Sequence, residues 1–96
     1  MINNRGNGAV NQFVIRDNGK LVFQSYESTI AEIDYTEKTI TIFPHYDYSR
    51  TTGKHRNIFF EDYAYLPELA TLKGLREAMK KGEYVGRYET YKVITM

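Results

Sequence analysis

Apolar and polar residues alternate over the first half of the chain with the period of two that is typical of β-strands. Residues 12–26 read QFVIR, DNGK and LVFQSY, and Asn18-Gly19 is the dipeptide preferred in a type I′ hairpin turn. Residues 29–34 and 39–43 repeat the alternation around the polar connection YTEK. The pattern therefore predicts two β-hairpins, which together supply four antiparallel strands.

The alternation stops at Pro44, whose nitrogen cannot donate a hydrogen bond to a strand ladder. Ser49 or Asp47 is suited to cap a helix over about residues 51–62, although Gly53 inside that range is a poor helix former. The apolar face of this helix would carry Ile58, Phe59 and Tyr63.

A second helix is predicted up to Gly82, which is suited to end it, with Thr71 as its N-terminal cap. A start at Pro67 is also compatible with the sequence. The apolar residues recur at helical spacing, at Leu72, Leu75 and Met79. The tail then returns to strand-like composition, with residues 91–95 as the expected fifth strand.

These elements predict an α+β fold, an antiparallel sheet of about five strands with two helices packed on one face. Residues 1–11 are rich in Asn and Gly, and we expect a flexible N-terminal arm there. Residues 12–96 are expected to form a single domain. The core is expected to contain Leu21, Phe23, Ile33, Ile40, Ile42, Phe59, Leu72, Leu75 and Met79.

Composition narrows the classes of function. Thirteen Lys and Arg against twelve Asp and Glu give a net charge of +1, too small for bulk attraction to duplex nucleic acid or to a membrane surface. The absence of Cys removes disulfides and thiol chemistry, and no apolar run approaches a membrane span or a signal peptide. We expect a soluble protein of the cytoplasm. Nine Tyr stand out in a chain without Trp. Each can fill the core with its hydroxyl in water, which is the plainer interpretation, or serve as a rigid contact residue at an interface.

Residues 45–56, HYDYSRTTGKHR, combine rings, cations and hydroxyls more densely than a turn requires. Such a mixture suits phosphate and base stacking, or anchoring of a protein partner. A solvated helix face is the plain alternative, and it also describes the cations at Arg76, Lys80 and Lys81, which Glu77 and Glu83 offset. The partner-binding residues predicted in the segment are Tyr46, Tyr48, Arg50, Lys54 and Arg56.

The residue spacing in the same segment does not match the motifs of phosphate-binding, metal-binding or catalytic sites. A phosphate-binding loop needs a glycine five residues before Gly53 and a hydroxyl residue after Lys54, but these positions hold Tyr48 and His55. His45, Asp47 and His55 match no helical two-histidine metal motif, and no nucleophile elbow or oxyanion hole accompanies Ser49. We therefore expect no catalytic residues, no metal and no cofactor.

Residues 23–60 resemble a family of small, mostly uncharacterised proteins encoded by phages and mobile elements of Gram-positive bacteria. The resemblance is carried by Ser25-Tyr26, by Ile30-Ala31 and by the run Tyr-Asp-Tyr-Ser-Arg-Thr-Thr-Gly-Lys-His at residues 46–55. It implies an origin but no established activity. Small accessory phage proteins often antagonise host defence, as anti-CRISPR proteins do, by binding without chemistry.

The leading hypothesis is thus a non-enzymatic phage-encoded inhibitor of host defence, in the host cytoplasm, which binds and blocks a host nuclease such as a CRISPR effector or its nucleic-acid channel. One alternative is a nucleic-acid-binding accessory protein, and another is a sponge for a nucleotide signal. A homodimer is also open, because the Tyr-rich C-terminal strand could be buried or could form a pairing edge.

Overall fold

The computed structural model describes residues 12–86 and 89–96. The predicted flexible arm, residues 1–11, lies outside the described residues. The six strands are β1 (Gln12–Asp17), β2 (Lys20–Ser25), β3 (Ser28–Asp34), β4 (Thr39–Ile42), β5 (Glu83–Val85) and β6 (Thr90–Thr95). The helices are α1 (Arg50–Ile58), the π-helical turn η1 (Phe59–Tyr63), the 3₁₀ turn η2 (Pro67–Leu69) and α2 (Leu72–Lys81).

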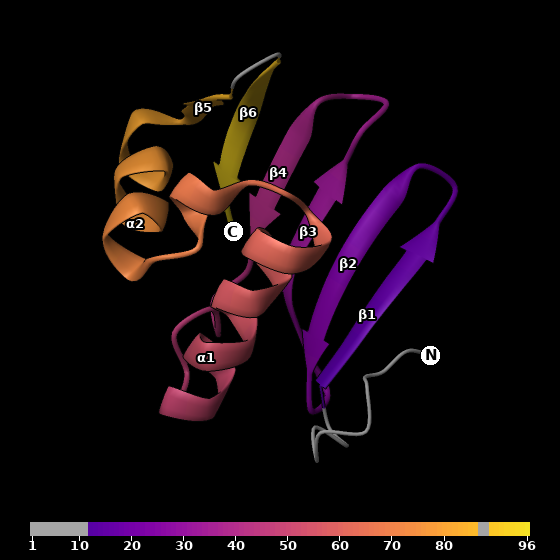
Figure 1. Ribbon diagram of the computed structural model, residues 1–96, viewed down its shortest axis with the longest axis vertical. Helices are drawn as coiled ribbons and strands as arrows, with labels where there is room; N and C mark the ends of the chain where they lie inside the picture. The colour runs from indigo at the N-terminus through magenta and orange to yellow at the C-terminus, as the bar shows by residue number, and fades with distance from the viewer. Residues whose placement is uncertain (1–11, 87–88) are drawn as a thin grey trace.

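The strands form one sheet in the order β1-β2-β3-β4-β6-β5. Figure 1 shows α1 and α2 on the same side of this sheet. The predicted α+β fold is confirmed, with six strands in place of about five. One pair differs from the antiparallel prediction, since β4 and β6 run parallel. A parallel neighbour requires a crossover connection, and α1 and α2 supply it by carrying the chain over the sheet between β4 and β6.

Local turn chemistry sets the hairpins. Asn18 and Gly19 both have positive φ, 49° and 81°, as a type I′ turn requires, which confirms the first predicted hairpin. In the turn between β3 and β4, a side-chain oxygen of Asp34 accepts hydrogen bonds from the backbone N–H groups of Thr36 and Glu37, both at 3.0 Å. Both predicted hairpins are therefore present, and β2 also pairs with β3.

The helix caps are those expected from the sequence. The Ser49 hydroxyl accepts from the Thr52 N–H at the start of α1, and the Thr71 hydroxyl accepts from the Gly74 N–H at the start of α2. Gly82 ends α2 with a φ of 77°, in the left-handed region that glycine adopts without strain. None of the helices in the described ranges is long and apolar enough to span a membrane.

The core lies between the sheet and the helices. Seven of the nine residues expected there are buried: Leu21, Phe23, Ile33, Ile40, Ile42, Phe59 and Leu75. Met79 is partly buried against the core, whereas Leu72 lies outside it and lines a shallow hollow with Lys73 and Arg76.

The π-helical turn η1 adds a core residue that the helical pattern did not predict. The Ala64 N–H donates to the Phe59 carbonyl, five residues back, which widens the turn. Phe59 and Phe60 both lie fully buried, with ring centroids 5.1 Å apart, and Phe59 also stacks on Phe23. Phe60 is therefore part of the core together with Phe59, whereas the sequence pattern assigned only Phe59 to it.

Candidate functional site

The segment between β4 and α1 folds into two successive turns. The Tyr46 N–H donates to the Phe43 carbonyl and the Tyr48 N–H to the His45 carbonyl, each at 3.1 Å. The Phe43 N–H donates to the Ile30 carbonyl of β3, which ties the start of the segment to the sheet. Ser49 then caps α1. The backbone of this segment is therefore held at both ends and within.

Asp47 joins the segment to both helices. One carboxylate oxygen lies 3.6 Å from Arg56 Nη1 of α1, and the other accepts from Arg76 Nη2 of α2 at 3.1 Å. Arg56 Nη1 also donates to the Tyr46 carbonyl at 2.6 Å, and Arg76 Nε donates to the Tyr46 hydroxyl at 3.3 Å. The two arginines thus clamp the backbone and side chains of Tyr46 and Asp47.

Arg56 is buried, with 2% of its surface exposed. Burial lowers the pKa of its guanidinium, and the nearby charge of Asp47 acts in the opposite direction. Its Nε has no hydrogen-bond partner among the described residues. In this structure Arg56 therefore supports the segment from within and does not present its charge to a partner.

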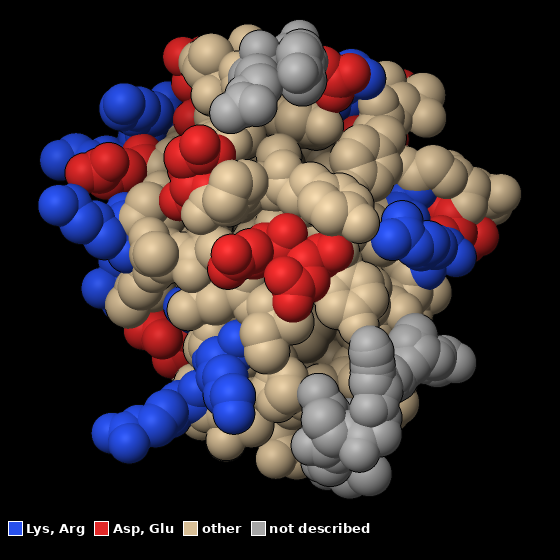
Figure 2. Space-filling view, in the orientation of Figure 1, with Lys and Arg blue, Asp and Glu red and all other residues tan. Residues whose placement is uncertain are grey.

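The other predicted partner-binding residues lie closer to solvent. Tyr48 is 70% exposed, and Arg50 and Lys54 are exposed on α1. No ion pair forms at Arg50 or Lys54 within the described ranges. Tyr46 is half-buried and packs against the core. Figure 2 shows basic side chains along α2 and over the start of α1, and others at the opposite side of the viewed face.

An open cleft of about 910 Å³ separates the turn between β2 and β3 from the start of α1. Tyr26 lies on the side of the turn between β2 and β3, half exposed and with a φ of 56°. Tyr48 lies on the side of α1. The cleft is lined by Ser25, Tyr26, Glu27, Ser28, Ile30, His45, Tyr48, Ser49, Thr51 and Thr52.

A chain of hydroxyls forms part of this lining. The Ser49 hydroxyl lies 3.2 Å from the Thr52 hydroxyl, which lies 3.1 Å from the Ser25 hydroxyl. Ser25 and Thr52 are buried, so each satisfies the other where water is excluded. Sequence reasoning missed this contact between β2 and α1, although Ser25 continues the inward positions of Leu21 and Phe23 along β2.

His45 is the polar ring of the cleft. Its Nδ1 lies 3.2 Å from the Ser28 hydroxyl, and its ring meets that of Tyr48 edge-on with centroids 5.5 Å apart. His55 lies on α1, where burial, and then the charge of Lys54, lower the pKa of its imidazole. The ring contact with His45 holds Tyr48 beside the cleft, and most of the Tyr48 surface stays accessible.

The structure does not assemble a catalytic triad from Ser49, Asp47 and a histidine. Asp47 is engaged by two arginines, and the Ser49 hydroxyl is engaged as a helix cap. In the described part of the chain, no group of three or more His, Asp or Glu side chains is placed to hold a metal ion. What the cleft offers is a hydroxyl-lined recess between two exposed tyrosines.

A family model matches residues 1–71, which cover β1 to β4, α1 and both short helical turns. The chain belongs to this family, a family of unknown function (DUF8033). No curated protein and no solved structure matches the chain. The family description names neither an activity nor a source, so the resemblance to phage proteins stays a prediction.

Proposed function

We propose that the chain is a non-enzymatic binding protein that meets a partner protein through the Tyr48 surface, which we define as Tyr26, Tyr48, Arg50 and Lys54. The observation that carries the proposal is the 70% exposure of Tyr48 on a segment held by hydrogen bonds. A large ring on a fixed backbone loses little conformational entropy when it is covered, and Tyr and Arg are enriched at binding hot spots.

The partner we propose is a host defence protein, such as a CRISPR nuclease. The support is the resemblance of residues 23–60 to small proteins of phages and mobile elements. A chain of 96 residues would inhibit such a partner by covering a functional surface. The cleft between Tyr26 and Tyr48 would receive a projecting side chain or turn of the partner, with the exposed Thr51 as a hydrogen-bonding residue.

Binding to single-stranded nucleic acid is the second candidate, and the charges of Arg50 and Lys54, which form no ion pair with another described residue, favour it. Two observations weaken this second candidate: Arg56 is buried, and Arg76 is paired with Asp47. Arg50 and Lys54 are then the two cations of the segment that phosphates can reach. Two phosphate contacts on a single strand predict a slope of about −1.4 in log K against log salt. A partner protein held mainly by Tyr48 predicts a smaller salt dependence.

The test is a pull-down from host lysate with the wild-type chain and two triple variants. Tyr48→Ala, Arg50→Ala and Lys54→Ala together alter the Tyr48 surface. Lys73→Ala, Lys80→Ala and Lys81→Ala together alter the exposed face of α2 and serve as the matched control. We expect one protein partner that the first variant loses and the second keeps, from lysate treated with nuclease.

Two results would overturn the proposal. Equal capture by the two triple variants would remove the Tyr48 surface from the function. Capture of nucleic acid in place of protein, with the salt slope given above, would favour the second candidate. Protection of the chain against heat by a nucleotide alone would instead support the sponge hypothesis.

A further inference from the structure

Strand β1 forms one edge of the sheet. The strand order gives it β2 as its one neighbour among the described strands, and Figure 1 shows it at the end of the sheet farthest from α2. It spans six residues, and its register with β2 is unbroken. Its apolar centre, residues 13–15, carries no proline and no bulge, two devices by which proteins prevent an edge strand from pairing with another chain. Strand β1 is therefore suited to accept a further strand.

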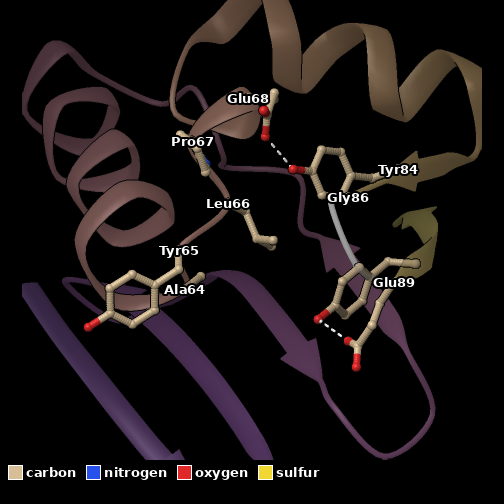
Figure 3. A pocket seen from close by; sticks show the side chains of 9 residues that line it. Ala64, Tyr65, Leu66, Pro67, Glu68, Tyr84, Gly86 and Glu89 are labelled. Atoms are coloured by element: carbon tan, nitrogen blue, oxygen red, sulfur yellow. Dashed lines mark hydrogen bonds between the residues drawn. The ribbon is translucent and has the colours of Figure 1, made fainter.

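The opposite edge, β5, is protected from such pairing. It has three residues, Glu83–Val85. The hydroxyl of Tyr84 donates to Glu68 of η2, and Figure 3 shows this bond between the strand and the short helical turn. A short edge that is tied to a neighbouring element offers few backbone groups to another chain. Of the two edges, β1 is thus the one that can pair.

The turn at Asn18-Gly19 determines which backbone groups of β1 face outward. In a two-residue hairpin the residues that flank the turn, here Asp17 and Lys20, exchange backbone hydrogen bonds. Bonded and non-bonded pairs alternate along an antiparallel ladder, so every second residue of β1 directs its N–H and C=O groups away from β2. These outward residues are Gln12, Val14 and Arg16.

The side chains of β1 are self-complementary about Val14, because residues 12–16 read polar, apolar, apolar, apolar, polar. When two copies of β1 run antiparallel with Val14 opposite Val14, all three outward residues pair, whereas a register shifted by two leaves one of them outside the pairing. Val14 packs against the core, so Phe13 and Ile15 face the side of the sheet away from the helices. There Phe13 lies opposite Ile15 of the second copy, a favourable cross-strand pair of an aromatic and a β-branched side chain.

A buried side chain at this edge lacks a hydrogen-bond donor. Gln12 is 7% exposed, and its Oε1 has no hydrogen-bond partner among the described residues. A buried amide oxygen without a partner is costly. In the pairing about Val14, Arg16 of the second copy lies opposite Gln12 on the same face of the sheet, and its guanidinium carries several N–H donors. Each copy thus brings the other a donor where one is missing.

We propose that two copies of the chain pair through β1, antiparallel and about a two-fold axis at Val14, to form one continuous sheet. Such an interface uses the same residues on both copies. This edge replaces the C-terminal strand as the pairing edge, because β6 lies inside the sheet. No residue of β1 belongs to the Tyr48 surface or lines its cleft, so either proposal can fail without the other.

Single cysteines test the register, because the chain itself has no Cys. Val14→Cys places two thiols at the two-fold axis, where Cα atoms of a hydrogen-bonded pair lie about 5.5 Å apart, within reach of a disulfide. Ile15→Cys is the matched control. Its two copies lie diagonally across the strands, about 7–8 Å apart, which is too far for a disulfide. Ile15 is also the more exposed of the two residues, so chance collision would favour the control.

Under mild oxidation we expect a disulfide-linked dimer from Val14→Cys and none from Ile15→Cys. Equal yields from the two variants, a higher yield from Ile15→Cys or no dimer from Val14→Cys would each overturn the proposal.

Sedimentation velocity measures the association of the wild-type chain, which should approach twice its monomer mass below about 100 µM. Ile15→Lys places a charge against Phe13 of the second copy and should weaken the association at least about tenfold. Ile94→Lys is the matched control, because Ile94 lies in the same cross-strand row but inside the sheet. It should leave the association unchanged. Circular dichroism of each variant separates lost pairing from lost folding.

Two results of the sedimentation experiment would contradict pairing through β1. The first is a wild-type chain that stays monomeric at all of these concentrations. The second is equal weakening by Ile15→Lys and Ile94→Lys, which would indicate that two sheets pack face to face.

Discussion

At the scale of single residues, position on the helix decides which cations of the segment reach solvent. Arg50 and Lys54 lie four residues apart in α1, and both are exposed. Arg56 follows Lys54 by two residues, which is about 200° around an α-helix, and it is buried. The composition of the segment predicted that these cations act as one cluster. Helical spacing instead places Lys54 and Arg56 on opposite sides of α1. The sequence could have indicated this separation, although not the contacts of Arg56 with Tyr46 and Asp47.

Arg56→Ala is expected to lower the free energy of unfolding by about 2 kcal/mol, because the buried guanidinium and its bond to the partly buried Tyr46 carbonyl are lost, while Asp47 keeps Arg76. Urea denaturation measures the change. Lys54→Ala, on the exposed side of the same helix, is the control and should stay within about 0.5 kcal/mol of wild type. Similar values for the two variants would show that the buried contacts of Arg56 do not hold the segment.

At the scale of elements, turns and helix ends that depend on one or two neighbouring residues were predictable from the sequence. Asn18-Gly19 specified its turn, and Ser49, Thr71 and Gly82 mark helix ends as expected. Strand β5 was not predicted, because its three residues are too few to show a period of two in the sequence. The π-helical turn was missed for a similar reason, since nothing local distinguishes it from the end of an α-helix.

Gly74 illustrates packing between elements that the sequence did not reveal. A Cβ added at this position in α2 would overlap the backbone oxygen of Glu68 in η2. Gly74→Ala should therefore lower the free energy of unfolding by about 1–2 kcal/mol, although alanine is the better helix former by about 1 kcal/mol. Thermal denaturation beside the exposed-site control Lys73→Ala checks the sign. A stabilised Gly74→Ala variant would mean that η2 does not pack on α2 in this way.

The buried Tyr91 of β6 is expected to make the stability of the fold depend on pH in the alkaline range. Burial, and then the hydrogen bond to Glu89, raise the pKa of Tyr91 from 10.0 to about 12. Between these values the unfolded chain releases the proton while the folded chain keeps it, so stability falls as pH rises. The stabilisation is complete below pH 10 and is lost toward pH 12.

Tyr91→Phe tests this dependence, because phenylalanine keeps the ring and cannot ionise. Melting temperatures of wild type and variant are compared from below pH 10 to pH 12. The wild type should lose more stability over this range than the variant. Parallel profiles would show that Tyr91 is not protected from ionisation in the folded chain.

At the scale of the whole molecule, strand order depends on contacts far apart in the chain. The C-terminal strand β6 inserts between β4 and β5, so it lies inside the sheet and not at its edge. The sequence predicted that a strand exists there but left its neighbour open, because periodicity carries no information on pairing. The family match ends at residue 71, yet the sheet is completed by residues beyond it.

A fragment of residues 1–71 should therefore fail to fold cooperatively. It lacks α2, β5 and β6, and with them the buried side chains of Leu75, Tyr91 and Val93, which belong to the same core cluster as Ile40 and Ile42 of β4. Urea unfolding followed by circular dichroism compares the fragment with the full chain. A sigmoidal transition of the fragment would show that the first 71 residues form an independent unit.

The central claim, that the Tyr48 surface binds a partner protein, is tested most directly by site-specific photo-crosslinking. A photoreactive phenylalanine analogue replaces Tyr48 in one variant and Val85 in another, positions that are 70% and 66% exposed. After irradiation in host lysate, position 48 should give one discrete protein adduct that position 85 does not give. The same adduct from both positions, or none from position 48, would contradict the account.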